Sequence, residues 1–188
     1  APLLVFAKSK DGARVPVEVT VAPIHDAAGD VIGGIEIFRD MSAMLHDLNR
    51  ARTVQSLSMH FPHPEDNRLD IRTRYVPNDL VGGDFLRIER LDEDRYAMLV
   101  ADVMGHGIAS ALYTMQLRSL WEEYRALLGS PSAFLSTLNE CLCVLSKGDD
   151  HFATAVHLVA NASTGEMSYA LAGHDRPLAI NRDGADMP

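Results

Sequence analysis

Residues 80–107 read LVGGDFLRIERLDEDRYAMLVADVMGHG and contain two apolar runs, each with an aspartate and glycines beside it. The runs 85–90 and 96–102 have the length and composition of β-strands. Asp84 stands just before the first run, and Asp102 ends the second. A carboxylate at the end of a buried strand costs free energy unless it is paired, hydrogen-bonded or bound to a cation. Asp102 is therefore a candidate ligand for a hard divalent cation, which prefers oxygen donors.

A structural role is the alternative for Asp102. The glycines that follow it indicate a sharp turn into a helix that opens near Gly107. In this role Asp102 would cap that helix, but it lies about five residues too early for a clean N-cap. From these residues alone, metal binding and helix capping both stay open.

The flanking sequence predicts further strands and two helices. Ser130 and Pro131 have the cap and first-turn chemistry of a helix start, and Cys141 lies on the apolar face of that helix as a small core residue. The expected elements are strands at 69–76, 152–160 and 166–172, and helices at 108–128 and from 131 onward. Strands, then a helical pair, then a hairpin favour an α+β fold in which helices pack on sheets.

The N-terminal part predicts a β-hairpin with one apolar face. Residues 15–22 alternate strictly, and residues 31–38 place Val31, Ile35 and Ile37 on one face. An isolated hairpin is marginally stable, so this one needs a partner from more chain or from another subunit. Residues 11–42, DGARVPVEVTVAPIHDAAGDVIGGIEIFRDMS, resemble the last strands of a PAS sensor domain. The alternative is a hairpin that decorates the main domain.

A helix is expected between the hairpin and the second part. Apolar residues recur at three- or four-residue spacing after Ser42, a candidate N-cap, and two prolines in FPHPED end the pattern. The stripe consists of Met41, Met44, Leu48, Ala51, Val54 and Leu57. It either packs on its own domain or forms a weak two-stranded coiled coil.

Composition and charge limit the possible partners. The 188 residues are 47% hydrophobic and 23% charged, which suits a globular protein with a sizeable core. A net charge of −9 argues against nucleic acid or an anionic membrane as the main partner, because both need a basic face. The sequence has no stretch apolar enough to span a membrane, no secretory signal and only two cysteines, so we expect a reducing, cytoplasmic setting.

Three motifs in this order resemble one enzyme family. They are VGGDF at 81–85, ADVMGHG at 101–107 and FATAVHLVANASTGEMSYALAGHDRPL at 152–178. They are similar to the metal-dependent protein phosphatases of the protein phosphatase 2C-like superfamily, in the bacterial sporulation-protein-E subgroup. The resemblance runs from about residue 55 to 181. It implies a two-layer β-sandwich flanked by helices, with two manganese or magnesium ions at one edge that promote direct attack of water on phosphoserine or phosphothreonine.

The resemblance also implies roles for individual residues. Asp102 corresponds to the carboxylate that bridges both metals, and Asp84 to a ligand of the first metal, direct or through water. The backbone carbonyl of Val103 corresponds to a further ligand of that metal. His106 is either a proton donor to the leaving group or part of the loop. His174, in AGHDRP, either contacts the phosphate or forms a hydrogen bond within its turn.

The sequence also departs from the family pattern. The further metal aspartates of the family lie beyond the AGH segment, and this sequence stops at Pro188 without them. Asp183 precedes a glycine but follows AGH too soon to take that role, and the loop acids at 92–94 and 149–150 are interpreted as solvated. No basic residue stands where larger relatives hold the phosphate with arginine. We therefore expect these 188 residues to bind at most one divalent ion weakly and to hydrolyse substrate close to background.

Together these features predict a signalling phosphatase. Residues 1–41 are read as the end of a PAS-like sensor, 42–61 as a linker helix that dimerises the protein, and 62–188 as the N-terminal portion of a serine/threonine phosphatase domain. The expected substrate is a phosphorylated regulatory protein such as an anti-sigma-factor antagonist. The alternatives are a catalytically inactive phosphatase-like scaffold and a sensor or dimerisation module.

Overall fold

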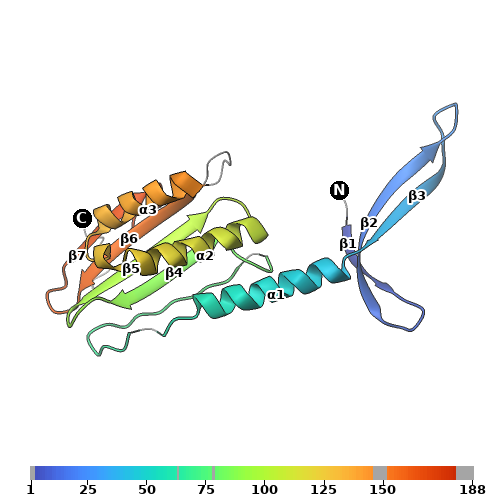
Figure 1. Cartoon of the computed structure of the whole chain (residues 1–188). Coiled ribbons are helices and arrows are strands. Elements are labelled where there is room, and N and C mark those ends of the chain that lie inside the picture. Colours follow the sequence, from blue (N-terminus) through green and yellow to red (C-terminus); the bar gives the residue numbers. More distant parts are fainter. Residues whose placement is uncertain (1–2, 63, 78, 146–151, 181–188) are drawn as a thin grey trace. The chain divides into compact units, whose positions relative to one another are not determined.

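The computed structural model describes residues 3–62, 64–77, 79–145 and 152–180. The chain divides into two compact units, Ala1–Arg50 and Ala51–Pro188 (Figure 1). The boundary falls inside helix α1 (Ser42–Met59), which is the linker helix that the sequence predicts. The sequence-based division at 41/42 and 61/62 stays a prediction.

The first unit is a three-stranded antiparallel sheet. Its strands β1 (Leu3–Lys8), β2 (Arg14–His25) and β3 (Val31–Asp40) lie in the order β1-β2-β3. The β2–β3 hairpin confirms the expected pair of strands, and β1 adds a third. The Asp26 carboxylate closes the hairpin turn by accepting hydrogen bonds from the backbone N–H groups of Ala28 and Asp30, both at 2.9 Å.

The expectation of one apolar face on this hairpin is wrong. Val19 pairs with Phe38, whereas Ile37 pairs with Thr20, so Ile37 lies on the face opposite the β2 valines. Directly paired residues point to the same side of a sheet, and a one-residue change of register moves every side chain to the other side. The register shifts at a bulge beside Ile24, a local feature that alternation does not reveal. Both faces of the sheet therefore carry apolar side chains.

The second unit contains a four-stranded antiparallel sheet in the order β4-β5-β6-β7. Helices α2 and α3 cover one of its faces, with α2 against β4 and β5 and α3 against β6 and β7 (Figure 1). The elements are β4 (Asp84–Arg90), β5 (Arg95–Val103), α2 (Ile108–Glu123), the 3-10 helix η1 (Arg125–Leu127), α3 (Pro131–Leu145), β6 (Ala153–Asn161) and β7 (Met167–Ala172).

These elements confirm the α+β class and most of the expected boundaries. Among the described residues from 51 to 180, the four strands make one sheet layer, and the second layer of the expected sandwich is not seen there. The expected strand at 69–76 is wrong, because that segment has no regular secondary structure. The side chains of this segment alternate, but its backbone does not pair with a neighbouring strand, and a β-strand needs that pairing for its backbone hydrogen bonds.

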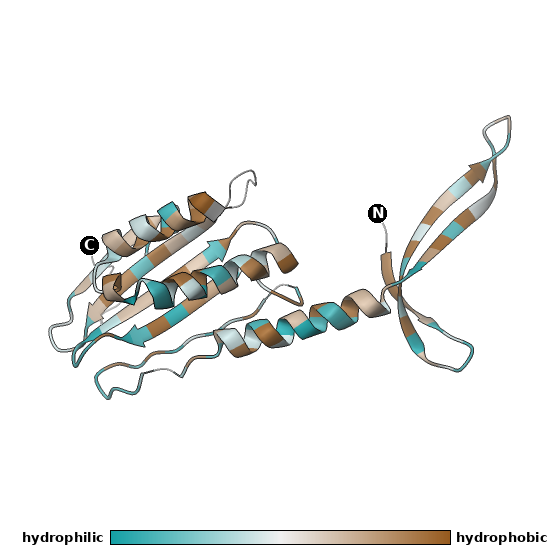
Figure 2. Ribbon diagram, viewed as in Figure 1, coloured by the Kyte–Doolittle hydropathy of each residue, from teal (hydrophilic) through white to brown (hydrophobic). Residues whose placement is uncertain are grey.

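The core of this unit lies between the sheet and the two helices. Trp121 and Phe134 pack edge to face with their ring centroids 5.6 Å apart, and Trp121 Nε1 donates a hydrogen bond to Glu89 at 2.9 Å. Cys141 is half-buried against this core, as predicted. Figure 2 shows hydrophobic residues along the strands and the covering helices. The buried cluster comprises Phe85, Ala97, Leu99, Ala101, Val103, Leu117, Leu120, Trp121, Leu128, Phe134, Leu135, Leu138, Ala155 and Val159.

His157 is an ionisable group inside this core. Its side chain is fully buried, and Nε2 lies 2.9 Å from the carbonyl oxygen of Leu128. The ring centroids of Phe134 and Trp121 lie 4.8 and 5.7 Å away. Burial lowers the pKa of His157 from its ordinary value, since it outweighs the hydrogen bond to Leu128. The folded protein therefore holds His157 in its neutral form at neutral pH.

We expect the free energy of unfolding to fall as the pH drops below about 6.5, the ordinary pKa of histidine. Below that pH the unfolded chain binds a proton that the buried ring resists, with a slope of at most about 1.4 kcal/mol per pH unit. Urea unfolding at several pH values measures it. His157→Gln keeps a donor for Leu128 but does not titrate, so it should reduce the slope, whereas the exposed His60→Gln should not. An unchanged slope in His157→Gln would contradict the assignment.

Candidate metal centre

Three polar side chains form a row across one end of the β4-β5-β6 sheet. Asp84 at the start of β4 pairs directly with Asp102 near the end of β5, and Asp102 pairs with Thr154 on β6. Paired residues of neighbouring antiparallel strands point to the same side of the sheet. Their neighbours Phe85 and Ala101 point into the core under the helices. The two carboxylates therefore lie side by side on the other face, where both residues are exposed.

The electrostatics of this pair favour a cation. Although Asp84 is exposed, desolvation by the surrounding protein raises its pKa from the ordinary value, and the negative charge of Asp102 raises it further. His174 acts in the opposite direction and lowers this pKa. A bound divalent cation would relieve the repulsion between the two carboxylates. The donor set of two carboxylates therefore fits a hard metal ion.

The carbonyl of Val103 is fixed beside the carboxylates by a close backbone approach. The Val103 N–H donates a hydrogen bond to the Gly83 carbonyl at 3.0 Å. A Cβ atom on Gly83 would lie 2.8 Å from the Val103 oxygen, closer than such atoms approach in proteins. Only glycine therefore allows this position for the carbonyl, which explains the second glycine of VGGDF.

The turn after Val103 settles the alternative role of Asp102. Gly105 and Gly107 have φ angles of 91° and 85°, and α2 begins at Ile108 with Gly107 as its N-cap. No side chain makes a capping hydrogen bond there, so Asp102 does not cap the helix. His106 lies in this turn and is exposed. Its proposed role as a proton donor stays a prediction.

His174 joins the row from the segment after β7. Its Nδ1 lies 2.8 Å from Thr154 Oγ1, and Gly173 forms an isolated β-bridge with Ala155. The partner of His174 Nδ1 is thus a side chain on β6, whereas the alternative role expected a hydrogen bond to backbone within the turn. Sequence reasoning missed Thr154. It is a polar residue in an apolar run, but only the pairing of β6 with β5 brings it beside Asp102.

Within the described residues, no third side chain completes a metal-binding cluster with Asp84 and Asp102. No group of three or more His, Cys, Asp or Glu side chains that could hold a metal occurs among residues 3–62, 64–77, 79–145 and 152–180. Asp149, Asp150 and Asp183 lie outside the described residues. Of the loop acids, Asp92 forms an ion pair with Arg95 at 2.7 Å, and Asp94 forms one with Arg68 at 2.6 Å. Both carboxylates therefore stabilise the loops in which they lie.

A helix suited to crossing a membrane does not occur in the described part of the chain. By sequence, the chain is similar to the phosphoserine phosphatase RsbP of Bacillus subtilis (strain 168), with 33% identity over 140 residues. The match covers 73% of this chain and 34% of RsbP, so the chain spans about a third of that relative.

A solved structure and a family model also show similarity to this chain. The SiaA-PP2C domain of Pseudomonas aeruginosa superposes with a TM-score of 0.57 at 22% identity, over 70% of this chain and 55% of that one. This likeness supports the fold alone. Residues 92–187, which include Asp102, Val103 and His174, match the family model described as Stage II sporulation protein E (SpoIIE). The chain therefore belongs to the SpoIIE family.

Proposed function

We propose that these residues form part of a metal-dependent protein serine/threonine phosphatase of bacterial signalling. The observation that carries the proposal is the direct pairing of Asp84 with Asp102 beside the Val103 carbonyl. Membership of the SpoIIE family and the similarity to a protein named as a phosphoserine phosphatase support it.

In this proposal the chain supplies a preorganised set of oxygen donors. Asp102 and Asp84 hold manganese or magnesium with the Val103 carbonyl. Such ions neutralise charge on a phosphate and lower the pKa of water, which is the chemistry that phosphate ester hydrolysis needs. His174, held by Thr154, stands in the same row and can contact the phosphate as a donor. None of these residues needs to act as a nucleophile.

The proposed substrate is a phosphoserine on a regulatory protein such as an anti-sigma-factor antagonist, and the first unit is the proposed PAS-like control element. The proposed setting is the cytoplasm, in keeping with the low cysteine content of the sequence. These assignments rest on the likeness to RsbP and on the sequence pattern.

A catalytically inactive scaffold is the second candidate. The absence of a third metal-binding side chain near Asp84 and Asp102 within the described residues favours it. The two candidates differ in one measurement, which is manganese-dependent hydrolysis of a phosphoserine peptide by the full-length gene product that carries these residues. Turnover above background supports the phosphatase. Manganese binding without turnover supports the scaffold.

We further expect α1 to mediate a homodimer. Val54 and Leu57 on this helix are 60% and 73% exposed, so they do not pack on their own unit. Burying them against a second copy would remove apolar surface from water. Light scattering at high micromolar concentration should give the mass of a dimer, and Val54→Glu with Leu57→Glu should give a monomer.

Two other exposed leucines provide the matched control for this test. Leu112 and Leu178 are 64% and 73% exposed and lie outside α1. Changing both to Glu adds the same charge and should leave the dimer intact. A monomeric wild-type protein at high micromolar concentration would argue against dimerisation through α1.

A further inference from the structure

The side chain of Gln55 on α1 is buried and fully bonded. It is 6% exposed, and its Nε2 donates hydrogen bonds to the Gly82 carbonyl at 2.7 Å and to Thr114 Oγ1 on α2 at 3.0 Å. Its Oε1 accepts a hydrogen bond from the Gly82 N–H at 3.1 Å. Burying a primary amide is costly unless its polar atoms are paired, and here both are. Gln55 therefore holds both backbone polar groups of Gly82.

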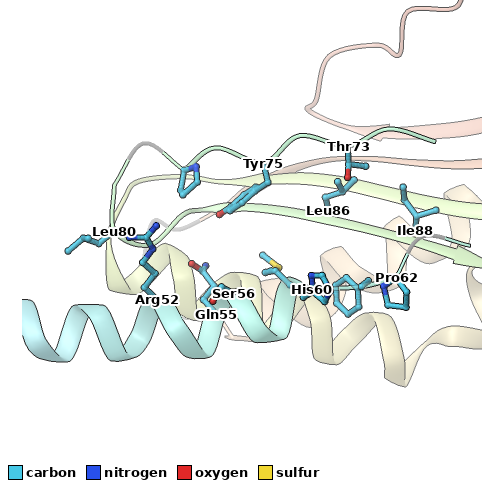
Figure 3. A pocket seen from close by; sticks show the side chains of 13 residues that line it. Arg52, Gln55, Ser56, His60, Pro62, Thr73, Tyr75, Leu80, Leu86 and Ile88 are labelled. Carbon is cyan, nitrogen blue, oxygen red and sulfur yellow. The ribbon is translucent and has the colours of Figure 1, made fainter. Parts of the chain in front are cut away.

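Gly82 is also confined by a second side chain. A Cβ atom on Gly82 would overlap the hydroxyl of Tyr75 and would lie 3.2 Å from Pro77 Cβ. Gln55 on α1 and Tyr75 on the facing segment line one cavity of about 580 Å³. Figure 3 shows both side chains. The backbone at Gly82 thus has little freedom to move toward either side.

The contact continues directly into the metal centre. Gly82 is followed by Gly83, whose carbonyl accepts the hydrogen bond from Val103, and then by Asp84. The strand β4 begins only at Asp84, so the two glycines precede the regular ladder. Their position is set by Gln55 on one side and by Val103 on the other. The Gly82 backbone is therefore linked through Gly83 to Asp84, the residue that pairs with Asp102.

We propose that Gln55 is a positioning residue for the metal centre. Through its two bonds to Gly82 it sets where the Gly82–Gly83 turn places Asp84 beside Asp102 and the Val103 carbonyl. Helix α1 is thereby connected to the proposed ligand Asp84 through the backbone of Gly82 and Gly83. The hydrogen bonds of Gln55 reach this backbone and not the Asp84 side chain. The inference rests on the proposed function, because it concerns the affinity of that centre for its cation.

The test compares Gln55→Met with Thr114→Val in the 188-residue chain. Methionine has nearly the shape of glutamine but loses all three hydrogen bonds. Thr114→Val removes one of them and leaves Gly82 held. Manganese is titrated into each protein, and binding is followed by the paramagnetic broadening of the Asp102 and Asp84 amide signals. We expect about tenfold weaker manganese binding in Gln55→Met, as for other residues that orient metal ligands, and little change in Thr114→Val.

Amide hydrogen exchange at Gly82 provides a readout that needs neither metal nor activity. Loss of the Gln55 acceptor should speed exchange of this amide in Gln55→Met, while Thr114→Val should leave it protected. A purely structural role would lower stability in both variants without changing the manganese affinity of the folded protein. If Gln55→Met does not fold, Gln55→Asn, which keeps the amide but cannot reach Gly82, should give the same two changes.

The outcomes separate this inference from the proposed function. Wild-type binding of manganese with equal binding by Gln55→Met would overturn the positioning role and leave the proposed function standing. Equal weakening in Gln55→Met and Thr114→Val would also overturn it, because the bonds to Gly82 would then not be the cause. A 188-residue chain that binds no manganese would overturn the positioning role, whereas a full-length gene product that neither binds manganese nor hydrolyses the peptide would overturn the proposed function.

Discussion

Asp102→Asn should abolish manganese-dependent phosphatase activity while leaving the fold intact. Asp102 pairs with Asp84 at the centre of the row and is exposed, so the isosteric, neutral amide causes no packing defect. It removes the carboxylate that the family resemblance assigns to both metals. Loss of several kcal/mol of charge stabilisation corresponds to a fall in kcat/KM of about a thousandfold or more.

Hydrolysis of a phosphoserine peptide by the full-length gene product measures this effect, with circular dichroism to confirm folding. Asp70→Asn is the matched control, because Asp70 is an exposed aspartate in the same unit that forms an ion pair with Arg72 at 2.8 Å. It should retain wild-type activity. Wild-type activity in Asp102→Asn would show that Asp102 is not a ligand of a metal that the reaction needs.

Gly83→Ala should damage the site by the addition of a single methyl group. The added Cβ would lie 2.8 Å from the Val103 oxygen and 3.2 Å from Ser110 Cβ. Both the Val103 backbone and Ser110 are held in place, since Val103 is buried in the core and Ser110 is buried on α2. Relieving the overlap must displace the Val103 carbonyl, so we expect about 1–3 kcal/mol of destabilisation and manganese binding weakened by about tenfold.

Urea unfolding and manganese titration of the 188-residue chain measure the two effects of Gly83→Ala. Gly129→Ala is the control, because a Cβ there would meet its nearest atom, on Arg95, at an ordinary 3.6 Å. It should change neither quantity appreciably. If Gly83→Ala kept wild-type manganese affinity, the Val103 carbonyl would not be a ligand.

The local parts of this site follow from sequence, whereas its long-range parts do not. Asp84 and Asp102 stand out in the sequence by the apolar runs and glycines beside them, and the family resemblance assigns both to one metal centre. Thr154 reaches Asp102 only because β6, some fifty residues later, pairs with β5. No local pattern specifies that pairing, since it depends on how the helices between the strands fold back on the sheet.

Gln55 shows a different limit of sequence reasoning. The stripe on α1 is defined by its apolar residues, and a glutamine between them reads as solvent-exposed. Its burial follows from the bonds that Gly82 and Thr114 offer, which exist only in the folded unit. The face assignment of Ile37 failed for a similar reason, because a single bulged position on β2 and β3 decides the parity of the whole hairpin.

The two-sided apolar sheet of the first unit has a consequence for aggregation. Strand β3 (Val31–Asp40) is an edge strand, and its residues Val31, Ile32, Ile35, Ile37 and Phe38 are all exposed. An edge with unpaired backbone groups and apolar side chains on both faces is a template for adding strands from other molecules. Natural edges are usually blunted by charge, whereas here only Glu36, Arg39 and Asp40 interrupt the apolar run. If the first unit were expressed by itself, its sheet would be prone to pair with strands of other molecules and to aggregate.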